Sequence, residues 1–270
     1  MTERPCPPLT EADVETFQRD GVVCLRQVLN PEWIELLRAN IERYLTRPSD
    51  VGSDAAAGQG GRFQLDYHMW TWDADQRRFV FRSPLGEIAG RVMRSTAAYL
   101  TVDLMLVKEP RTPKRTPWHT DTLYGWYEGA QMASIWVGLD PVTAESGAVE
   151  FVRGSHAWGR HFSPVSFGGN EIRVEGAESV PDVEADRDSY DIIHFDTEPG
   201  DVIVNHLGIL HAAPGNGSDR RRRAIAFRFG GDDCRYIDRP GSMKPIRDPG
   251  IPSGAPIGCD LFPRIWLGAA

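Results

Sequence analysis

The sequence predicts an α+β protein in which helices come first and a run of short strands follows. Apolar residues recur at helical spacing up to about residue 101, whereas short apolar segments separated by turns follow from Val102 onwards. The length of 270 residues, with 41% hydrophobic and 25% charged side chains, suits one large domain. We therefore expect a single domain over residues 1–270, made of a mainly helical part (1–101), a strand-rich core (102–232) and a C-terminal extension (233–270).

The helical part contains the signals that start and end helices. Thr10 is expected to cap a first helix that ends at Gly21, because a hydroxyl accepts a first-turn N–H and glycine tolerates the left-handed conformation at a C-terminus. Asn30 and Pro31 are expected to open a longer amphipathic helix as its cap and first residue. A third helix is expected after Pro84. The polar residues 47–61 have no periodicity and predict a loop.

The strand-rich core is read from short apolar segments bounded by turns. Strands are expected at 22–25, 102–107, 132–139, 148–152, 192–195, 201–205 and 223–229. About eight such strands could close into a double-sheet jelly roll. The acidic residues 159–190 have no hydrophobic pattern strong enough for a core and are expected to form a long loop.

Composition excludes several classes of function. A net charge of −8 disfavours a nucleic-acid partner, because such partners are bound by basic patches. No segment approaches the roughly 18 consecutive apolar residues of a membrane span, and the first residues lack the pattern of a secretory signal. The four cysteines show no C-x-x-C spacing, which argues against a zinc ribbon. We expect a cytoplasmic protein that acts on a small molecule, with no protein partner indicated.

Three residues are candidates for a metal site. His119 and Asp121 are two positions apart just after an expected strand, so their side chains point to the same side of an extended chain. His211 follows the expected strand at 201–205, and if the two regions are neighbours the three residues form a facial triad of two histidines and one carboxylate. Such a triad suits Fe(II) and leaves open coordination sites for a co-substrate and oxygen.

Arg222 strengthens this interpretation. It lies eleven positions after His211, at the head of an alternating segment that predicts a strand. An arginine there could bind the far carboxylate of a dicarboxylic co-substrate through two parallel hydrogen bonds. Taken alone, it would be read as a surface arginine among its three arginine neighbours.

The chain resembles the phytanoyl-CoA dioxygenase family of iron- and 2-oxoglutarate-dependent oxygenases over most of its length. The similarity is carried by FQRDGVV at 17–23, WHTD at 118–121, SIWVGLD at 134–140, ESGAVEFVRGSH at 145–156, and His211 with Arg222. The resemblance implies a cupin-like double-stranded β-helix, a relative of the jelly roll. It also implies that His119, Asp121 and His211 hold Fe(II), that Arg222 anchors 2-oxoglutarate, and that O₂ is consumed. Further contacts with 2-oxoglutarate are expected from Thr116, Trp136 and Gln64.

The substrate is predicted only as a class. Tyr67, Trp72 and Tyr124 belong to two aromatic clusters near the expected site and are candidates for substrate contacts. We expect hydroxylation or a related C–H oxidation of a small, partly hydrophobic organic molecule, in the tailoring of a secondary metabolite. The alternatives are an acyl-CoA hydroxylase of the same family, with the basic residues 111–115 near the carrier, a metalloenzyme that needs no oxoacid, and an inactive metal-binding recognition module. Because Asp121 is retained, halogenation is disfavoured.

Overall fold

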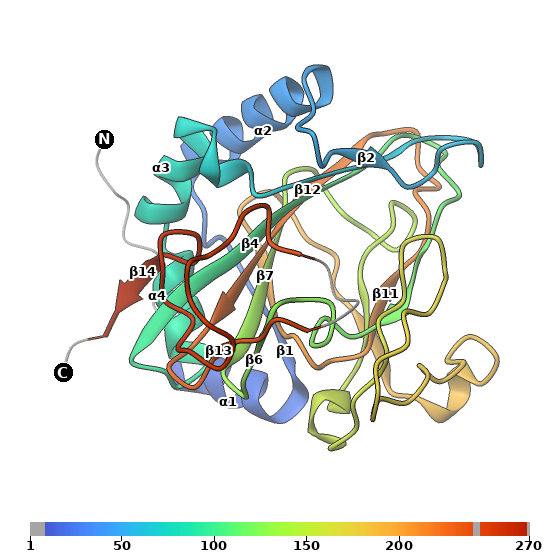
Figure 1. Ribbon diagram of the computed structural model, residues 1–270. Helices are drawn as coiled ribbons and strands as arrows, with labels where there is room; N and C mark the ends of the chain where they lie inside the picture. The colour runs from blue at the N-terminus through green and yellow to red at the C-terminus, as the bar shows by residue number, and fades with distance from the viewer. Residues whose placement is uncertain (1–8, 240–243, 269–270) are drawn as a thin grey trace.

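The computed structural model describes residues 9–239 and 244–268, and most of its strands belong to two sheets that face each other (Figure 1). The larger sheet has eight strands, and neighbours in it are antiparallel. Its order is β1 (Val22–Leu25), β10 (Val202–His206), β7 (Met132–Gly138), β12 (Arg222–Gly230), β4 (Ala97–Lys108), β3 (Phe63–Tyr67) and β2 (Ser53–Asp54), with β14 (Arg264–Leu267) also paired to β4.

The smaller sheet has four strands and carries much of the functional site. Its order is β5 (Thr116–His119), β11 (His211–Ala213), β8 (Glu150–Val152) and β9 (Ile192–His194). A separate pair joins β6 (Tyr127–Glu128) to β13 (Arg235–Tyr236). Two facing antiparallel sheets of this kind form the predicted jelly roll, so the predicted fold class is confirmed.

Four α-helices cover the outer face of the larger sheet (Figure 1). They are α1 (Glu11–Asp20), α2 (Pro31–Thr46), α3 (Ala74–Arg82) and α4 (Leu85–Val92). The Thr10 hydroxyl accepts a hydrogen bond from the Asp13 N–H, and the Asn30 side chain accepts one from the Trp33 N–H, as their capping roles require. Gly21 ends α1 with a φ of 78°, a conformation that glycine adopts without steric cost.

The strands of the larger sheet send alternate side chains into two cores, because successive residues of a strand point to opposite faces. On β12, Ile225 and Phe227 belong to the core beneath the helices, whereas Ala226 belongs to the core between the sheets. On β7, Ile135 and Trp136 divide in the same way. Small side chains such as Ala226 therefore face the smaller sheet, where they leave room for a cavity.

Several elements differ from the sequence prediction. Helix α3 and strands β3 and β14 were not predicted, and β4 begins at Ala97 rather than at Val102. The long segment 159–190 is mostly irregular, as expected, but it contributes two buried residues, Phe162 and Val183, to a small core with Trp118. It is therefore packed onto the smaller sheet.

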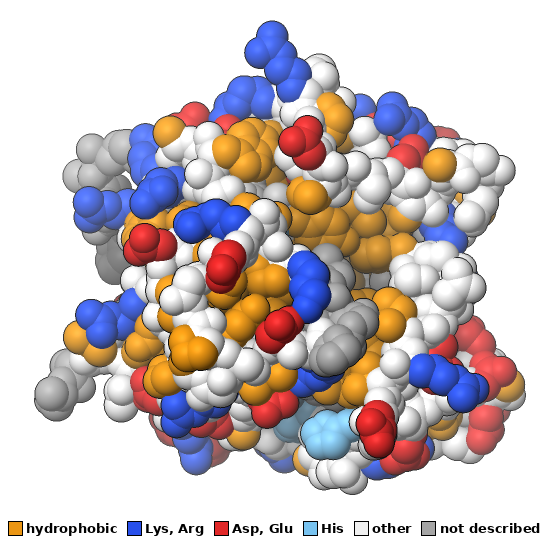
Figure 2. Space-filling view, in the orientation of Figure 1, with side chains coloured by type: hydrophobic (Ala, Val, Ile, Leu, Met, Phe, Trp, Pro, Cys, Tyr) orange, Lys and Arg blue, Asp and Glu red, His pale blue; other side chains and the backbone are white. Residues whose placement is uncertain are grey.

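The described residues contain no helix that is both long and apolar enough to cross a membrane. On the face seen in Figure 2, basic and acidic side chains are interspersed around hydrophobic ones. Cys24, Cys234 and Cys259 are free thiols, and Cys6 lies outside the described residues.

Candidate metal centre

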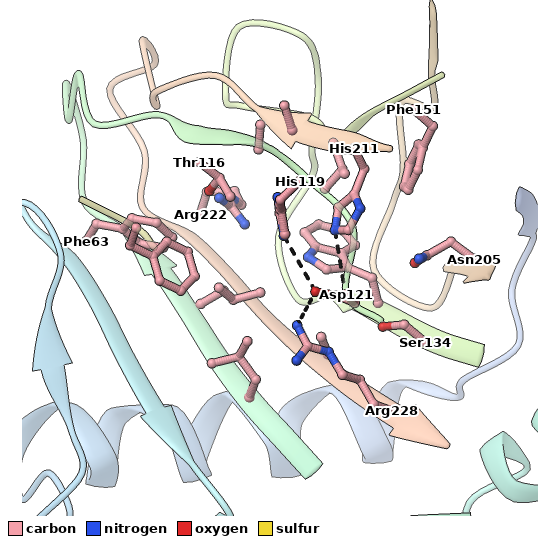
Figure 3. A pocket seen from close by; sticks show the side chains of 18 residues that line it. Phe63, Thr116, His119, Asp121, Ser134, Phe151, Asn205, His211, Arg222 and Arg228 are labelled. Carbon is pink, nitrogen blue, oxygen red and sulfur yellow. Dashed lines mark hydrogen bonds and ion pairs between the residues drawn. The ribbon is translucent and has the colours of Figure 1, made fainter. Parts of the chain in front are cut away.

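His119, Asp121 and His211 converge between the two sheets (Figure 3). His119 ends β5 and His211 begins β11, and the two residues are direct partners across the antiparallel pairing. The Nε2 atom of His119 lies 3.5 Å from Oδ1 of Asp121, and Nε2 of His211 lies 3.8 Å from Oδ2. One ligand atom from each residue lies within 4.8 Å of the others. The pairing of β5 with β11 thus makes neighbours of two histidines that are 92 positions apart in the sequence.

Both imidazoles are oriented by backbone carbonyls. Nδ1 of His119 lies 2.8 Å from the Pro117 carbonyl oxygen, and Nδ1 of His211 lies 3.0 Å from that of Ile209. When Nδ1–H donates to a carbonyl, Nε2 keeps its lone pair for a metal. Burial, together with the nearby His119, lowers the pKa of His211 to about 4, so that the imidazole is neutral at physiological pH.

Asp121 completes the donor set as a carboxylate. Burial opposes its ionisation, but the Arg228 guanidinium and the two histidines outweigh that effect and hold the pKa of Asp121 below its usual range. Nη2 of Arg228 donates to Oδ1 of Asp121 at 2.7 Å. Two imidazoles and one carboxylate on one side of a point suit Fe(II). The residues present therefore fit the predicted metal.

Arg222 lies in the same cavity as the metal candidates and lacks an ionic partner. Its side chain is only 2% exposed, and no ion pair among the described residues includes it. Its Nε is buried without a hydrogen-bond partner, and its guanidinium lies 5.7 Å from the centre of the Trp136 ring. Burial lowers its pKa to about 10, which leaves it charged at neutral pH. A buried, unpaired cation of this kind requires an anion, and the carboxylate of a dicarboxylic co-substrate fits the position.

Two of the three other predicted co-substrate contacts line the cavity, and the third does not. Thr116 and Trp136 line this cavity. Gln64 does not: Phe63 and Tyr67 on the same strand line the cavities, and the two-residue alternation of β3 turns Gln64 to the opposite face. The structure thus places Gln64 outside the lining of both cavities, which the sequence could not indicate because it did not show which face of β3 is internal.

Two of the three predicted substrate residues line a chamber near the metal candidates, and the third does not. Tyr67 and Tyr124 line a second chamber that adjoins the first and shares His119 and Asp121 with it. Trp72 lies outside both chambers, 49% exposed and packed edge-on against Tyr44 of α2. Trp72 is thus exposed beside the helical layer, and the structure does not bring it to the candidate site.

Several cavity residues were missed by sequence reasoning. They include Phe63, Ser134, Phe151, Asn205 and Arg228. Arg228 carries a usable signal, because it lies six positions after Arg222 on a predicted strand and so shares its face. The remaining four are ordinary strand residues whose position depends on how the sheets pair. The other histidines, at 68, 156, 161, 194 and 206, do not join the metal cluster found among the described residues.

Comparison with known proteins decides the family. Residues 17–224 match the model of the phytanoyl-CoA dioxygenase (PhyH) family. The chain belongs to this family. A probable phytanoyl-CoA dioxygenase of Caenorhabditis elegans is 26% identical over 153 residues, which cover 54% of this chain and 47% of that protein. This chain therefore spans about half the length of that relative.

Solved structures support the fold of this PhyH-family protein. The α-ketoglutarate-dependent carbocyclase SnoK from nogalamycin biosynthesis has a TM-score of 0.79 and 23% identity, over 95% of this chain and 96% of SnoK. The epimerase SnoN, in complex with Fe³⁺, α-ketoglutarate and nogalamycin RO, has a TM-score of 0.74 and 21% identity, over 95% of this chain and 98% of SnoN. The family assignment agrees with the enzyme class that the resemblance implies, an oxygenase that uses iron, 2-oxoglutarate and oxygen.

Proposed function

We propose that this protein is an Fe(II)- and 2-oxoglutarate-dependent dioxygenase that hydroxylates, or otherwise oxidises at a C–H bond, a small and partly hydrophobic organic substrate. One observation carries the proposal: the buried, unpaired Arg222 opens into the cavity that holds His119, Asp121 and His211. A metal triad alone fits many metalloenzymes, whereas a triad with an unpaired arginine fits a dicarboxylic co-substrate.

The side chains of this cavity have separate roles in the proposal. His119, Asp121 and His211 hold the metal from one side, and Arg222 binds the distal carboxylate of 2-oxoglutarate. Thr116 and Trp136 line the space around that co-substrate. When bound, iron(II) and 2-oxoglutarate supply the oxidising chemistry, with O₂ as the oxidant. The protein orients the substrate and excludes water, because the walls of the adjoining chamber are mostly apolar.

Tailoring of a secondary metabolite is the favoured role. The same fold occurs in SnoK and SnoN, which belong to nogalamycin biosynthesis. The rival role, an acyl-CoA hydroxylase, needs a surface that binds a phosphate-bearing carrier. Two of the three basic residues suggested for this purpose are already paired with carboxylates: Arg111 lies 2.7 Å from Asp219, and Arg115 lies 2.5 Å from Glu184. A cytoplasmic location stays a prediction of the sequence.

The proposal is tested by succinate release from protein loaded anaerobically with Fe(II), then given 2-oxoglutarate, ascorbate and air. Wild type is expected to release succinate slowly even without its substrate, and His119→Ala and Arg222→Ala are expected to lose this turnover. Arg220→Ala is the matched control, since Arg220 is an exposed neighbour of Arg222 in the same arginine cluster. If iron is bound but wild type releases no succinate, the inactive recognition module is the better interpretation. If Arg222→Ala keeps full turnover, the enzyme does not need an oxoacid.

A further inference from the structure

Arg228 lies where the two chambers meet. It lines both the cavity that contains Arg222 and the adjoining chamber that contains Tyr67 and Tyr124. Arg222 and Arg228 are at opposite ends of the same face of β12, with the small residue Ala226 between them. In Figure 3, Arg222 lies next to Thr116, whereas Arg228 lies beside Asp121. The two arginines therefore serve different parts of the site.

Arg228 is incompletely bonded. Among the described residues its guanidinium makes one hydrogen bond, from Nη2 to Oδ1 of Asp121 at 2.7 Å, and its Nε is buried without a partner. Its side chain keeps 17% exposure, and it contributes to the walls of both chambers. Asp121 is the only acidic residue among the described residues that line either chamber. These lining residues therefore offer Arg228 no second carboxylate.

The charges of the lining residues do not balance once the proposed ligands are bound. Iron(II) and the 2-oxoglutarate dianion together add no net charge. The lining contributes one negative charge, from Asp121, and two positive charges, from Arg222 and Arg228. With neutral metal-binding imidazoles, one positive charge is left over. Because an uncompensated charge is costly in a water-poor cavity, a ligand with one negative charge is favoured next to Arg228.

We propose that Arg228 is a specificity-determining residue that binds a single anionic oxygen group of the substrate, so that the substrate is an organic monoanion with an apolar body. This inference rests on the proposed function. The apolar body would lie against Leu104, Val165, Phe167 and Ile172, which line the second chamber. A carboxylate is the simplest such group, because a guanidinium binds it through two parallel hydrogen bonds.

The bond to Asp121 gives Arg228 a second role, in positioning the metal-binding carboxylate. Substitutions that change the charge of this side chain distinguish positioning of Asp121 from binding of a substrate anion. A neutral amide can hold the Asp121 oxygen but adds little attraction for an anion, so Arg228→Gln keeps the first role in part and loses most of the second. Arg228→Lys keeps the positive charge but loses the planar guanidinium, which can donate two parallel hydrogen bonds to a carboxylate.

The test measures binding rather than turnover. Protein is loaded anaerobically with Fe(II) and 2-oxoglutarate, and formation of the visible charge-transfer band of the iron complex is recorded first. Calorimetric titration then compares a graded series of aromatic monocarboxylates, from benzoate to 2-naphthoate and larger acids, each with its neutral amide. Wild type is expected to bind at least one acid about tenfold more tightly than its amide. Arg228→Gln should bring this ratio close to one, and Arg228→Lys should give an intermediate value.

Arg223→Gln is the matched control. Arg223 is on the same strand but on the opposite face, where it pairs with Asp140 at 2.6 Å, and its replacement changes the net charge equally. This variant should keep the wild-type ratio. If no acid in the series binds wild type more tightly than its amide, the inference is wrong, and this comparison needs no variant to fold. If the visible band does not form in wild type, the proposed function fails instead, and the inference fails with it.

Discussion

Asp103 is a buried carboxyl group that lines neither chamber. It lies on the face of β4 that meets the helices, and its Oδ2 accepts hydrogen bonds from the Trp70 N–H and the Gln76 side chain. Its Oδ1 is buried without a partner. Burial raises the pKa of Asp103 to about 7, despite these hydrogen bonds. The group is therefore protonated in the folded protein at pH values where the unfolded chain ionises it.

This shift predicts how stability depends on pH. Between about pH 4 and pH 7 the folded state binds more protons at Asp103 than the unfolded state does, so the contribution of Asp103 to stability falls as pH rises. Relative to Asp103→Asn, the free energy of unfolding of wild type should decrease by up to roughly 1.4 kcal/mol per pH unit in this window. Urea unfolding of both proteins at several pH values measures the difference. A difference that stays constant with pH would contradict the prediction.

At the residue scale, spacing and resemblance together predicted the candidate site. Spacing suggested His119, Asp121 and His211 as a triad. Arg222 became a candidate through its position after His211 and through the family resemblance, because taken alone it would be read as a surface arginine. Gln64 could not be placed, because a shift of one residue on a strand moves every side chain to the other face. Register is set by partner strands, and no sequence pattern near β3 reports it.

Helix α4 and strand β14 form a contact that joins distant parts of the chain. Gly86 and Gly90 of α4 lie against Ile265 and Trp266 of β14, and a Cβ atom at Gly90 would overlap the Trp266 ring. Helix propensity alone favours alanine at a helical glycine by about 1 kcal/mol. The overlap between a Cβ atom at Gly90 and the Trp266 ring instead disfavours alanine at this position.

We predict that Gly90→Ala destabilises the protein by about 1–3 kcal/mol, because overpacking outweighs propensity. Removing the ring should relieve the overlap, so Trp266→Ala should cost less in the Gly90→Ala background than in wild type. Denaturant unfolding of the two single variants and the double variant gives this coupling energy. A more stable Gly90→Ala protein would show that the contact adapts without cost.

Elements were predictable where a local signal exists. The caps at Thr10 and Asn30 identify α1 and α2, and the alternating or continuous apolar segments identify β7, β10 and β12. Helix α3 was missed because its segment is mostly polar, with Phe79 and Val80 as its buried apolar residues. Strand β14 was missed because a short edge strand depends on a partner, here β4, that lies far away in the sequence.

At the scale of the whole molecule, the larger sheet separates two cores, one tightly packed under the helices and one that contains a cavity. Its outer face is sealed by helices around residues such as Leu37 and Phe227. Its inner face meets the smaller sheet around a cavity that contains charged residues. The stability of the whole protein should therefore depend on what fills the cavity, since the buried Arg222 has no ionic partner among the described residues and its Nε has no hydrogen-bond partner.

This dependence predicts that Fe(II) and 2-oxoglutarate reverse the order of stability of wild type and Arg222→Met. Without ligands, the variant should be more stable by about 1–3 kcal/mol, because it removes a buried cation that has no ionic partner. With Fe(II) and 2-oxoglutarate at about one hundred times the dissociation constant, wild type should gain about 2.7 kcal/mol from the co-substrate, and the variant should gain only from the metal. Anaerobic denaturant unfolding with metal alone, with both ligands and with neither separates these contributions. If the variant is less stable than wild type without ligands, Arg222 stabilises the fold itself; if 2-oxoglutarate stabilises both proteins equally, the co-substrate does not bind through this arginine.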